Sequence, residues 1–295
     1  MSGGMVQPTT SWRVVAAAAA IVFALAGCTV FAPRESHDIL GEQTAPADVD
    51  PLGLVGMWKV SGAPGQSGDV WLRLEADDLL VVAECASHWG TWRGQDGHIV
   101  ADVPSGTKGF CDAGGQKHHW LAQVSAYVRT ADHGYTLSDS SGRVVARLTP
   151  DPHGGPPISK RYPNDFTRAP QVTDAMRAKL DFPAALPADA TAVMPVGRWV
   201  PAGAPPRSAL TDPYIEFDPS GSWVGSNGCG HADGHWFSAE GGLFAATVNG
   251  AEFAECMGTE VTTWTWTATR IGMVGDELTL FDVDGNELGS LVRDA

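Results

Sequence analysis

The stretch CASHWGTW at residues 85–92 recurs as CGHADGHW at residues 229–236, with cysteine, glycine and tryptophan at the same places. Further Trp and Cys residues repeat before and after this stretch. From the first cysteine onward, the paired positions lie 144 or 145 residues apart. The pairs are Trp58 with Trp199, Cys85 with Cys229, Gly90 with Gly234, Trp92 with Trp236, Cys111 with Cys256, and Trp120 with Trp264. This spacing predicts two copies of one domain.

Alternating apolar residues and short turn motifs predict that both copies are rich in antiparallel strands. Asp96-Gly97 is a hairpin signal, because its turn needs positive φ at both central residues. We expect a first domain over residues 52–150, a Pro/Gly-rich linker over 151–193 and a second domain over 194–295. The linker length favours limited contact between the domains, although its apolar residues could wrap onto one of them.

Helices are expected to be few. Trp120, Val124 and Val128 lie four apart in a segment without Pro or Gly, which predicts a helix over residues 116–130. The equivalent helix over 259–270 has poor intrinsic propensity, and 172–180 could form a short helix in the linker. The predicted fold class is therefore mainly β with α (α+β), with two tandem small antiparallel β-barrel or sheet domains and about one helix in each.

The N-terminal segment has the features of an export signal. An apolar run over residues 14–26 follows Arg13 and is too short for a comfortable membrane span. It ends in Leu25-Ala26-Gly27-Cys28, which resembles the bacterial lipobox, in which the cysteine receives lipid and cleavage occurs just before it. We expect a signal peptide over residues 1–27, lipidation at Cys28 and a flexible tether over 28–51. The protein would then lie on the extracytoplasmic face of the cell membrane.

Lipidation at Cys28 leaves four of the five cysteines for other roles. Disulfides are permitted outside the cytoplasm, and the duplication favours pairing within each copy over the other two connectivities. We therefore expect the disulfides Cys85–Cys111 and Cys229–Cys256.

The charge balance argues against one class of partner. Asp and Glu outnumber Lys and Arg by 34 to 19, and no basic stripe is present. Phosphate contacts need clustered Lys and Arg, so nucleic-acid binding is not expected.

Several motifs of the second copy together resemble a known family. They are Gly197-x-Trp199, the turn from Asp218 to Gly221, the steps Gly228-Cys229 and Glu255-Cys256, and the closing run from Leu278 to Gly285. This ordered set resembles the META domain, also called the HslJ-like domain, over most of residues 195–292. The resemblance implies a small barrel-like β fold with a helix, often in a membrane-anchored bacterial lipoprotein with a role in envelope stress or at the surface. It implies no known reaction, and Gly230 stands where the family commonly has Asn.

Alternative chemical roles for the second copy can be weighed from its residues. Cys229, His231, His235 and Cys256 have the ligand types of a zinc site, but the histidines do not recur in the first copy and a disulfide would remove the thiolates. Asp282-Val283-Asp284-Gly285 resembles half of a calcium loop, but the spacing of the EF-hand is missing. A hairpin turn and a disulfide are favoured, and no metal or cofactor is expected.

Catalysis is weakly indicated. Glu252, Glu255 and Asp233 could supply an acid/base pair, but they are equally well explained as solvated loop residues, and no known hydrolase or phosphate-loop motif appears. No catalytic residue is assigned.

A function specific to this protein should be sought where the copies differ, especially over residues 231–236 and 264–266. The candidate ligand-binding residues are His231, His235, Trp236, Trp264 and Trp266. We expect a non-enzymatic protein of the bacterial cell envelope that maintains envelope integrity or binds a protein partner or small ligand. A carbohydrate-binding protein or hydrolase with a Trp-lined cleft is the alternative.

Overall fold

A computed structural model describes residues 49–83, 86–103, 120–151, 153–156, 168–203, 209–252, 256 and 258–294. All of them belong to one compact unit of the chain, Thr44–Ala295. The expected signal peptide, Cys28, and the expected Cys85–Cys111 pair lie outside the described residues. No helix in the described part of the chain is long and apolar enough to cross a membrane.

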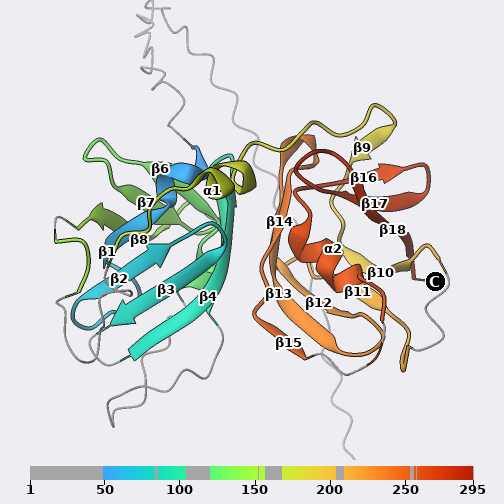
Figure 1. Ribbon diagram of the computed structural model, residues 1–295, viewed down its shortest axis with the longest axis horizontal. Helices are drawn as coiled ribbons and strands as arrows, with labels where there is room; N and C mark the ends of the chain where they lie inside the picture. Colours follow the sequence, from blue (N-terminus) through green and yellow to red (C-terminus); the bar gives the residue numbers. More distant parts are fainter. Residues whose placement is uncertain are drawn as a thin grey trace, which may run out of the picture. The chain divides into compact units, whose positions relative to one another are not determined.

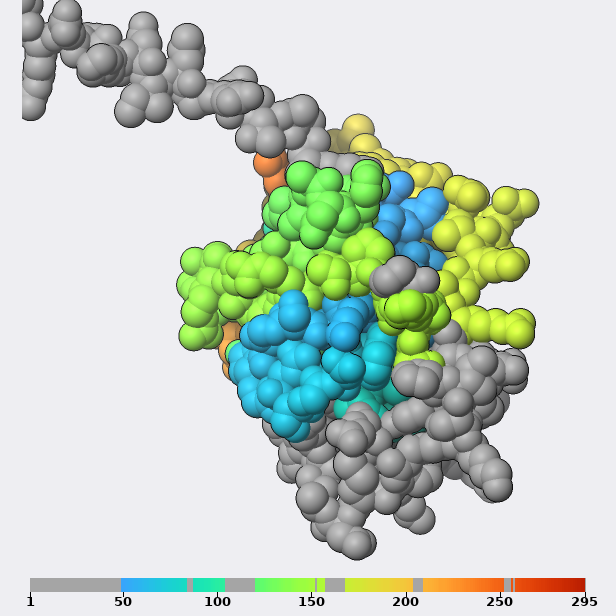
Figure 2. Space-filling view, turned by 90° about the vertical axis from the view of Figure 1, so that its left-hand side faces the viewer, coloured from blue at the N-terminus to red at the C-terminus, as the bar shows by residue number. Residues whose placement is uncertain are grey.

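The first copy is a closed antiparallel barrel of eight strands, in which β1 pairs with both β2 and β8 (Figure 1). Figure 2 looks onto this barrel, where the chain of β1 in blue and the chain around β8 in green lie side by side. The elements are η1 (Pro51–Leu54), β1 (Gly56–Ser61), β2 (Val70–Leu74), β3 (Asp78–Ala83), β4 (Ala86–Gln95), β5 (His98–Asp102), η2 (Leu121–Gln123), β6 (Ala126–Arg129), β7 (Tyr135–Ser138) and β8 (Val144–Pro150).

Local sequence explains much of the barrel. Asp96 and Gly97 have φ of 47° and 77°, so the expected hairpin joins β4 to β5 where Gln95 pairs with His98. Inward residues fill the interior with large side chains, including the buried Trp58 and Trp92. The end of the expected tether also packs on the barrel, because Pro51 is buried and Val49 accepts a hydrogen bond from Tyr127.

The prediction of a helix over residues 116–130 is wrong for residues 120–130, which the structure describes. The chain forms the short 3-10 turn η2 and then β6, which pairs with β7. Val124 is buried in the barrel interior, whereas Val128 is 48% exposed on the outside, so their spacing of four does not mark one apolar face. Strand pairing of β6 with β7 and β5 in the barrel outweighs a local helical pattern here.

The second copy forms a curved sheet with the strand order β14-β13-β12-β11-β10-β18-β17-β16-β9 (Figure 1). A bridge between Leu243 and Arg270 links its two sides, and β15 pairs with β13. The elements are β9 (Ala190–Ala192), β10 (Gly197–Pro201), β11 (Tyr214–Phe217), β12 (Ser222–Ser226), β13 (His231–Ser238), η4 (Glu240–Gly242), β14 (Phe244–Ala246), β15 (Gly250–Glu252), α2 (Val261–Thr267), β16 (Arg270–Val274), β17 (Glu277–Phe281) and β18 (Glu287–Arg293).

Two expectations for the second copy are confirmed. The helix predicted over 259–270 is present as α2, with Val261 and Thr265 buried. A disulfide joins Cys229 to Cys256, whose Cα atoms are 5.7 Å apart. Asn227 supports the first cysteine, because its Oδ1 accepts hydrogen bonds from the backbone N–H groups of Cys229 and Gly230 at 2.8 Å each.

The linker touches both copies. Its expected helix is α1 (Asp174–Lys179), which Thr173 caps by accepting a hydrogen bond from Met176. Leu180 is buried in the barrel core. Pro183 follows a few residues after Leu180, and its carbonyl oxygen accepts a hydrogen bond from Arg270 of the second copy at 3.1 Å. The linker is therefore packed against each copy, and not against one of them alone.

Two pairs of repeated tryptophans share a hydrogen bond in both copies. Trp58 donates from its indole N–H to the carbonyl of the residue four positions earlier at 2.7 Å, and Trp199 does the same at 2.6 Å. The backbone N–H of Trp92 donates to the carbonyl of Asp77, and that of Trp236 donates to the equivalent Gly221. The duplication seen in the sequence is thus also a duplication of local structure.

The repeated glycines allow close backbone contact, which yields a prediction. A Cβ atom at Gly90 would overlap the carbonyl oxygen of Asp102, and one at Gly234 would overlap that of Thr247. Each Gly→Ala substitution should lower the free energy of unfolding by about 1–3 kcal/mol, as measured by urea denaturation.

Gly203 supplies the matched control for both substitutions. It has open space around it, so Gly203→Ala should change stability by no more than about 0.5 kcal/mol. Equal stability of all three variants would contradict the proposed packing.

Candidate functional site

The two copies meet through equivalent strands. β5 of the barrel contacts β13, and β4 contacts β14. By the sequence repeat, β4 corresponds to β13 and β5 to β14, so each contact is the counterpart of the other. The interface therefore relates the copies by an approximate twofold axis.

A buried carboxylate lies at the centre of this interface. Asp102 is 3% exposed at the end of β5 and accepts hydrogen bonds only from the second copy among the described residues. The backbone N–H of His235 donates to its Oδ2 at 3.0 Å, and Nδ1 of the same ring lies 2.6 Å from its Oδ1. The hydroxyl of Thr247 also donates to Oδ2. A buried charge is tolerated when it is paired in this way.

The positions in this cluster are themselves repeated. Asp102 corresponds to Thr247, and Thr91 corresponds to His235. The Thr91 hydroxyl donates to the carbonyl of Val248 at 3.0 Å, and Arg93 donates to the carbonyl of Trp266 at 2.7 Å, so the other half of the interface is also hydrogen-bonded, but to neutral acceptors. Among the described residues, a carboxylate paired with an imidazole is found in only one half.

The pair changes the titration of His235. Its hydrogen bond with Asp102 raises its pKa above 6.5, the charge of Asp102 and that of Asp233 act in the same direction, and burial opposes them. The imidazolium form is therefore favoured next to the carboxylate.

A cavity opens on each side of the interface. The larger, which we call the Arg93 cavity, has a volume of about 590 Å³ and is lined by Trp92, Arg93, Val248 and Trp266 among others. The smaller, which we call the His235 cavity, has about 350 Å³ and includes Ala122, His235, Trp236 and Phe237. The cavities use equivalent positions of the two copies, namely Trp92 with Trp236, Arg93 with Phe237, and Trp266 with Ala122.

The Arg93 cavity combines apolar walls with a cation. Trp92 is fully buried, whereas Arg93 and Trp266 are half-buried. Nη1 of Arg93 donates to the carbonyl oxygen of Trp266 at 2.7 Å, near the C-terminal end of α2. Burial lowers the pKa of Arg93, although the nearby Asp77 opposes that shift. Such a site can enclose a small molecule and offer it a positive charge.

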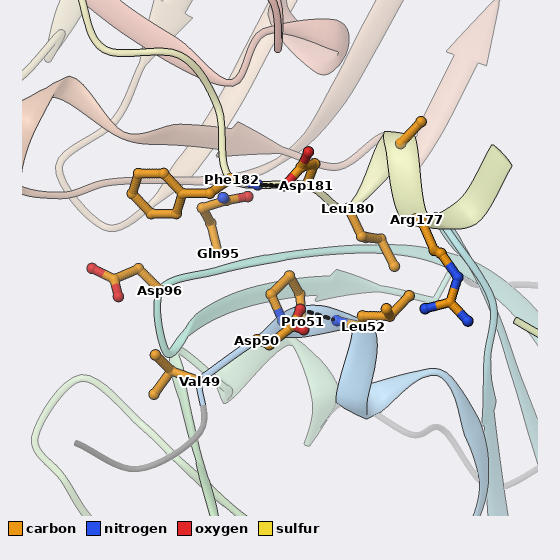
Figure 3. A pocket seen from close by; sticks show the side chains of 11 residues that line it. Val49, Asp50, Pro51, Leu52, Gln95, Asp96, Arg177, Leu180, Asp181 and Phe182 are labelled. Carbon is orange, nitrogen blue, oxygen red and sulfur yellow. Dashed lines mark hydrogen bonds between the residues drawn. The ribbon is translucent and has the colours of Figure 1, made fainter. Parts of the chain in front are cut away.

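A third cavity, of about 470 Å³, lies between η1, the β4–β5 turn and the segment that includes α1 (Figure 3). Gln95 lines it and is 7% exposed, and its Nε2 has no hydrogen-bond partner among the described residues. Asp50, Asp96 and Asp181 give this cavity an acidic lining with Arg177 as its cation.

The sequence-predicted ligand residues do not form one site. His235 and Trp236 line the His235 cavity, while Trp266 lines the Arg93 cavity. Trp264 packs against the core of the second copy, and His231 is exposed on β13. Sequence reasoning missed Asp102 and Arg93, although a comparison of the copies at these positions would have revealed that Thr247 and Phe237 replace them.

The residues considered for metal binding have other roles in the structure. The sulfurs of Cys229 and Cys256 are bonded to each other, so they are not thiolate ligands. Within the described ranges, no group of three or more His, Cys, Asp or Glu is arranged to hold a metal ion. Asp282 organises a hairpin turn between β17 and β18, accepting hydrogen bonds from the backbone of Asp284 and Asn286. The side chain of Glu252 and all of Glu255 lie outside the described residues.

The interface pair gives a pH-dependent prediction. Because the folded-state pKa of His235 is raised, its stabilising effect is fully present below about pH 6.5 and is lost as the pH rises through the folded-state value. The melting temperature of the protein should therefore fall as the pH rises above about 6.5, and His235→Gln should reduce that fall.

His231→Gln is the control, since His231 is exposed on the same strand. This variant should keep the pH dependence of the unchanged protein. An unaltered pH profile in His235→Gln would show that the pair does not stabilise the interface.

Comparisons with protein-family models, with curated proteins and with solved structures found no match.

Proposed function

We propose that this protein is a non-enzymatic lipoprotein of the bacterial cell envelope that binds a small ligand in the Arg93 cavity. The single observation that carries the proposal is the cavity itself, whose volume of about 590 Å³ lies within the usual range of small-molecule sites. Its walls come from both copies, with Trp92 in the barrel and Val248 and Trp266 in the second copy. A bound ligand would therefore contact both halves of the interface.

The cell-envelope assignment is supported by the sequence. The apolar run over residues 14–26 ends at a lipobox-like cysteine, Cys28. The motifs of the second copy resemble the META domain, and the matching tryptophan contacts of the first copy suit a second, diverged META-like domain. We propose two tandem META-like domains, held at the extracytoplasmic face of the membrane by lipid on Cys28.

Carbohydrate binding or hydrolysis in the same cavity is the second candidate, because two tryptophans and two carboxylates line it. The carboxylates have other partners, however. Asp77 forms an ion pair with Lys179, and Asp282 accepts the hydrogen bonds of its own turn. These contacts favour binding over acid/base chemistry.

Filling the cavity should abolish binding. N-phenyl-1-naphthylamine, a neutral fluorescent probe, should bind the purified full chain saturably. Ala251 is exposed and lines the cavity, so the added ring in Ala251→Trp should weaken binding by at least about tenfold. Fluorescence titration measures the change.

Ala122→Trp is the matched control, because Ala122 is also exposed and lines the His235 cavity. It should bind the probe as the unchanged protein does. Both variants carry the same apolar segment at residues 14–26. Binding of the probe to that segment would therefore be equal in the two variants and would not affect the comparison between them. Unaltered binding in Ala251→Trp would reject the Arg93 cavity as the site.

Lipidation is tested separately. Cells grown with an alkyne-bearing fatty acid should incorporate the label into the protein through Cys28, and Cys28→Ser should lose all of it. Cys85→Ser should retain the label as a control for the loss of a cysteine. Label that persists in Cys28→Ser would contradict anchoring at this residue.

A further inference from the structure

Arg93 has a charge without an anionic partner in its cavity. Its guanidinium makes one hydrogen bond among the described residues, from Nη1 to the carbonyl oxygen of Trp266 at 2.7 Å. Arginine stays protonated in proteins and carries five N–H donors. Several donors of a half-buried cation are therefore available to a ligand.

The neighbouring charges do not satisfy this cation. Asp77 is close enough to oppose the effect of burial on the pKa of Arg93, but its carboxylate bonds Lys179 on α1. Asp282 holds its turn through the backbone N–H groups of Asp284 and Asn286 at 3.0 and 2.8 Å. The cavity therefore has one cation whose partner is a neutral carbonyl.

The other copy shows that an arginine is not required by the fold at this position. Phe237 takes the equivalent place in the His235 cavity, where its ring stacks on His98 with the ring centres 5.4 Å apart. The arginine of that second cavity, Arg143, already pairs with Asp139 at 2.9 Å. The unpaired cation is thus a feature of one cavity, introduced where the other copy keeps an apolar ring.

We propose that the Arg93 cavity takes an amphipathic anion, whose acidic group binds the free N–H donors of Arg93 and whose apolar body lies against Trp92, Val248 and Trp266. This inference rests on the proposed ligand-binding function and adds the class of ligand. A planar guanidinium recognises carboxylate and phosphate oxygens well. Most of the surface that the lining exposes to the cavity is apolar, and the second cation of the lining, Lys179, is paired with Asp77. The same acidic chemistry occurs in a fatty acid and in a phosphate monoester with an alkyl chain.

Two probes with one scaffold test the charge requirement. 1-Anilinonaphthalene-8-sulfonate differs from N-phenyl-1-naphthylamine by its sulfonate. Arg93→Gln should raise the dissociation constant of the sulfonate probe by about 10- to 100-fold, as expected for loss of hydrogen bonds to a charged group. The dissociation constant of the neutral probe should change by less than about twofold. Fluorescence titration of the purified full chain measures both.

Two further variants separate charge from structure. Arg143→Gln in the His235 cavity should leave the binding of both probes unchanged, and Arg93→Lys should retain part of the preference for the sulfonate. Equal weakening of both probes by Arg93→Gln would assign Arg93 a structural role and overturn the inference. Unchanged sulfonate binding in that variant would overturn it as well.

Competition identifies the acidic group. Dodecanoate or dodecyl phosphate should displace the sulfonate probe, and the stronger competitor distinguishes a carboxylate from a phosphate ligand. Dodecanol should compete at least about tenfold less well. If the neutral probe binds and Ala251→Trp blocks it while neither acid competes, the anion inference fails and the proposed function stands. If neither probe binds the unchanged protein, the proposed function fails first.

Discussion

The structure depends on the contact between Asp102 and the second copy. Its buried carboxylate accepts hydrogen bonds from the backbone and ring of His235 and from the hydroxyl of Thr247. A carboxylate with 3% exposure is stable only because these donors replace water. The partners must therefore stay in register, and with them β5 and β13. This constraint positions the walls of both flanking cavities.

Much of the β architecture could be predicted from local sequence. Asp96-Gly97 marks its hairpin through backbone conformation alone, and the repeated tryptophans fix the correspondence between the copies. The strand β6, which stands in place of the expected first helix, could not be predicted, because the burial of Val124 and the exposure of Val128 follow from the position of β6 between β5 and β7 in the barrel. Local spacing does not contain that information.

The candidate site was less predictable than the fold. The sequence directed attention to Trp266, which does line the larger cavity, but it gave no reason to bring Asp102 near His235, 133 residues away. That contact arises when two sheet surfaces meet, and no short motif encodes it. The informative signal lay in the differences between the copies, where Arg93 stands opposite Phe237 and Asp102 opposite Thr247.

The cavities on the two sides of the approximate twofold axis can be altered independently by mutation. In a dimer of identical chains, one substitution would alter the cavities on both sides of the interface together, so a new side chain in one cavity would also appear in the other. Here the two flanks are encoded by separate codons of one gene. Arginine at position 93 places a cation in the larger cavity, while phenylalanine at 237 places an apolar ring at the equivalent position of the smaller one. Covalent fusion of the copies thus lets one flank specialise while the other preserves the scaffold.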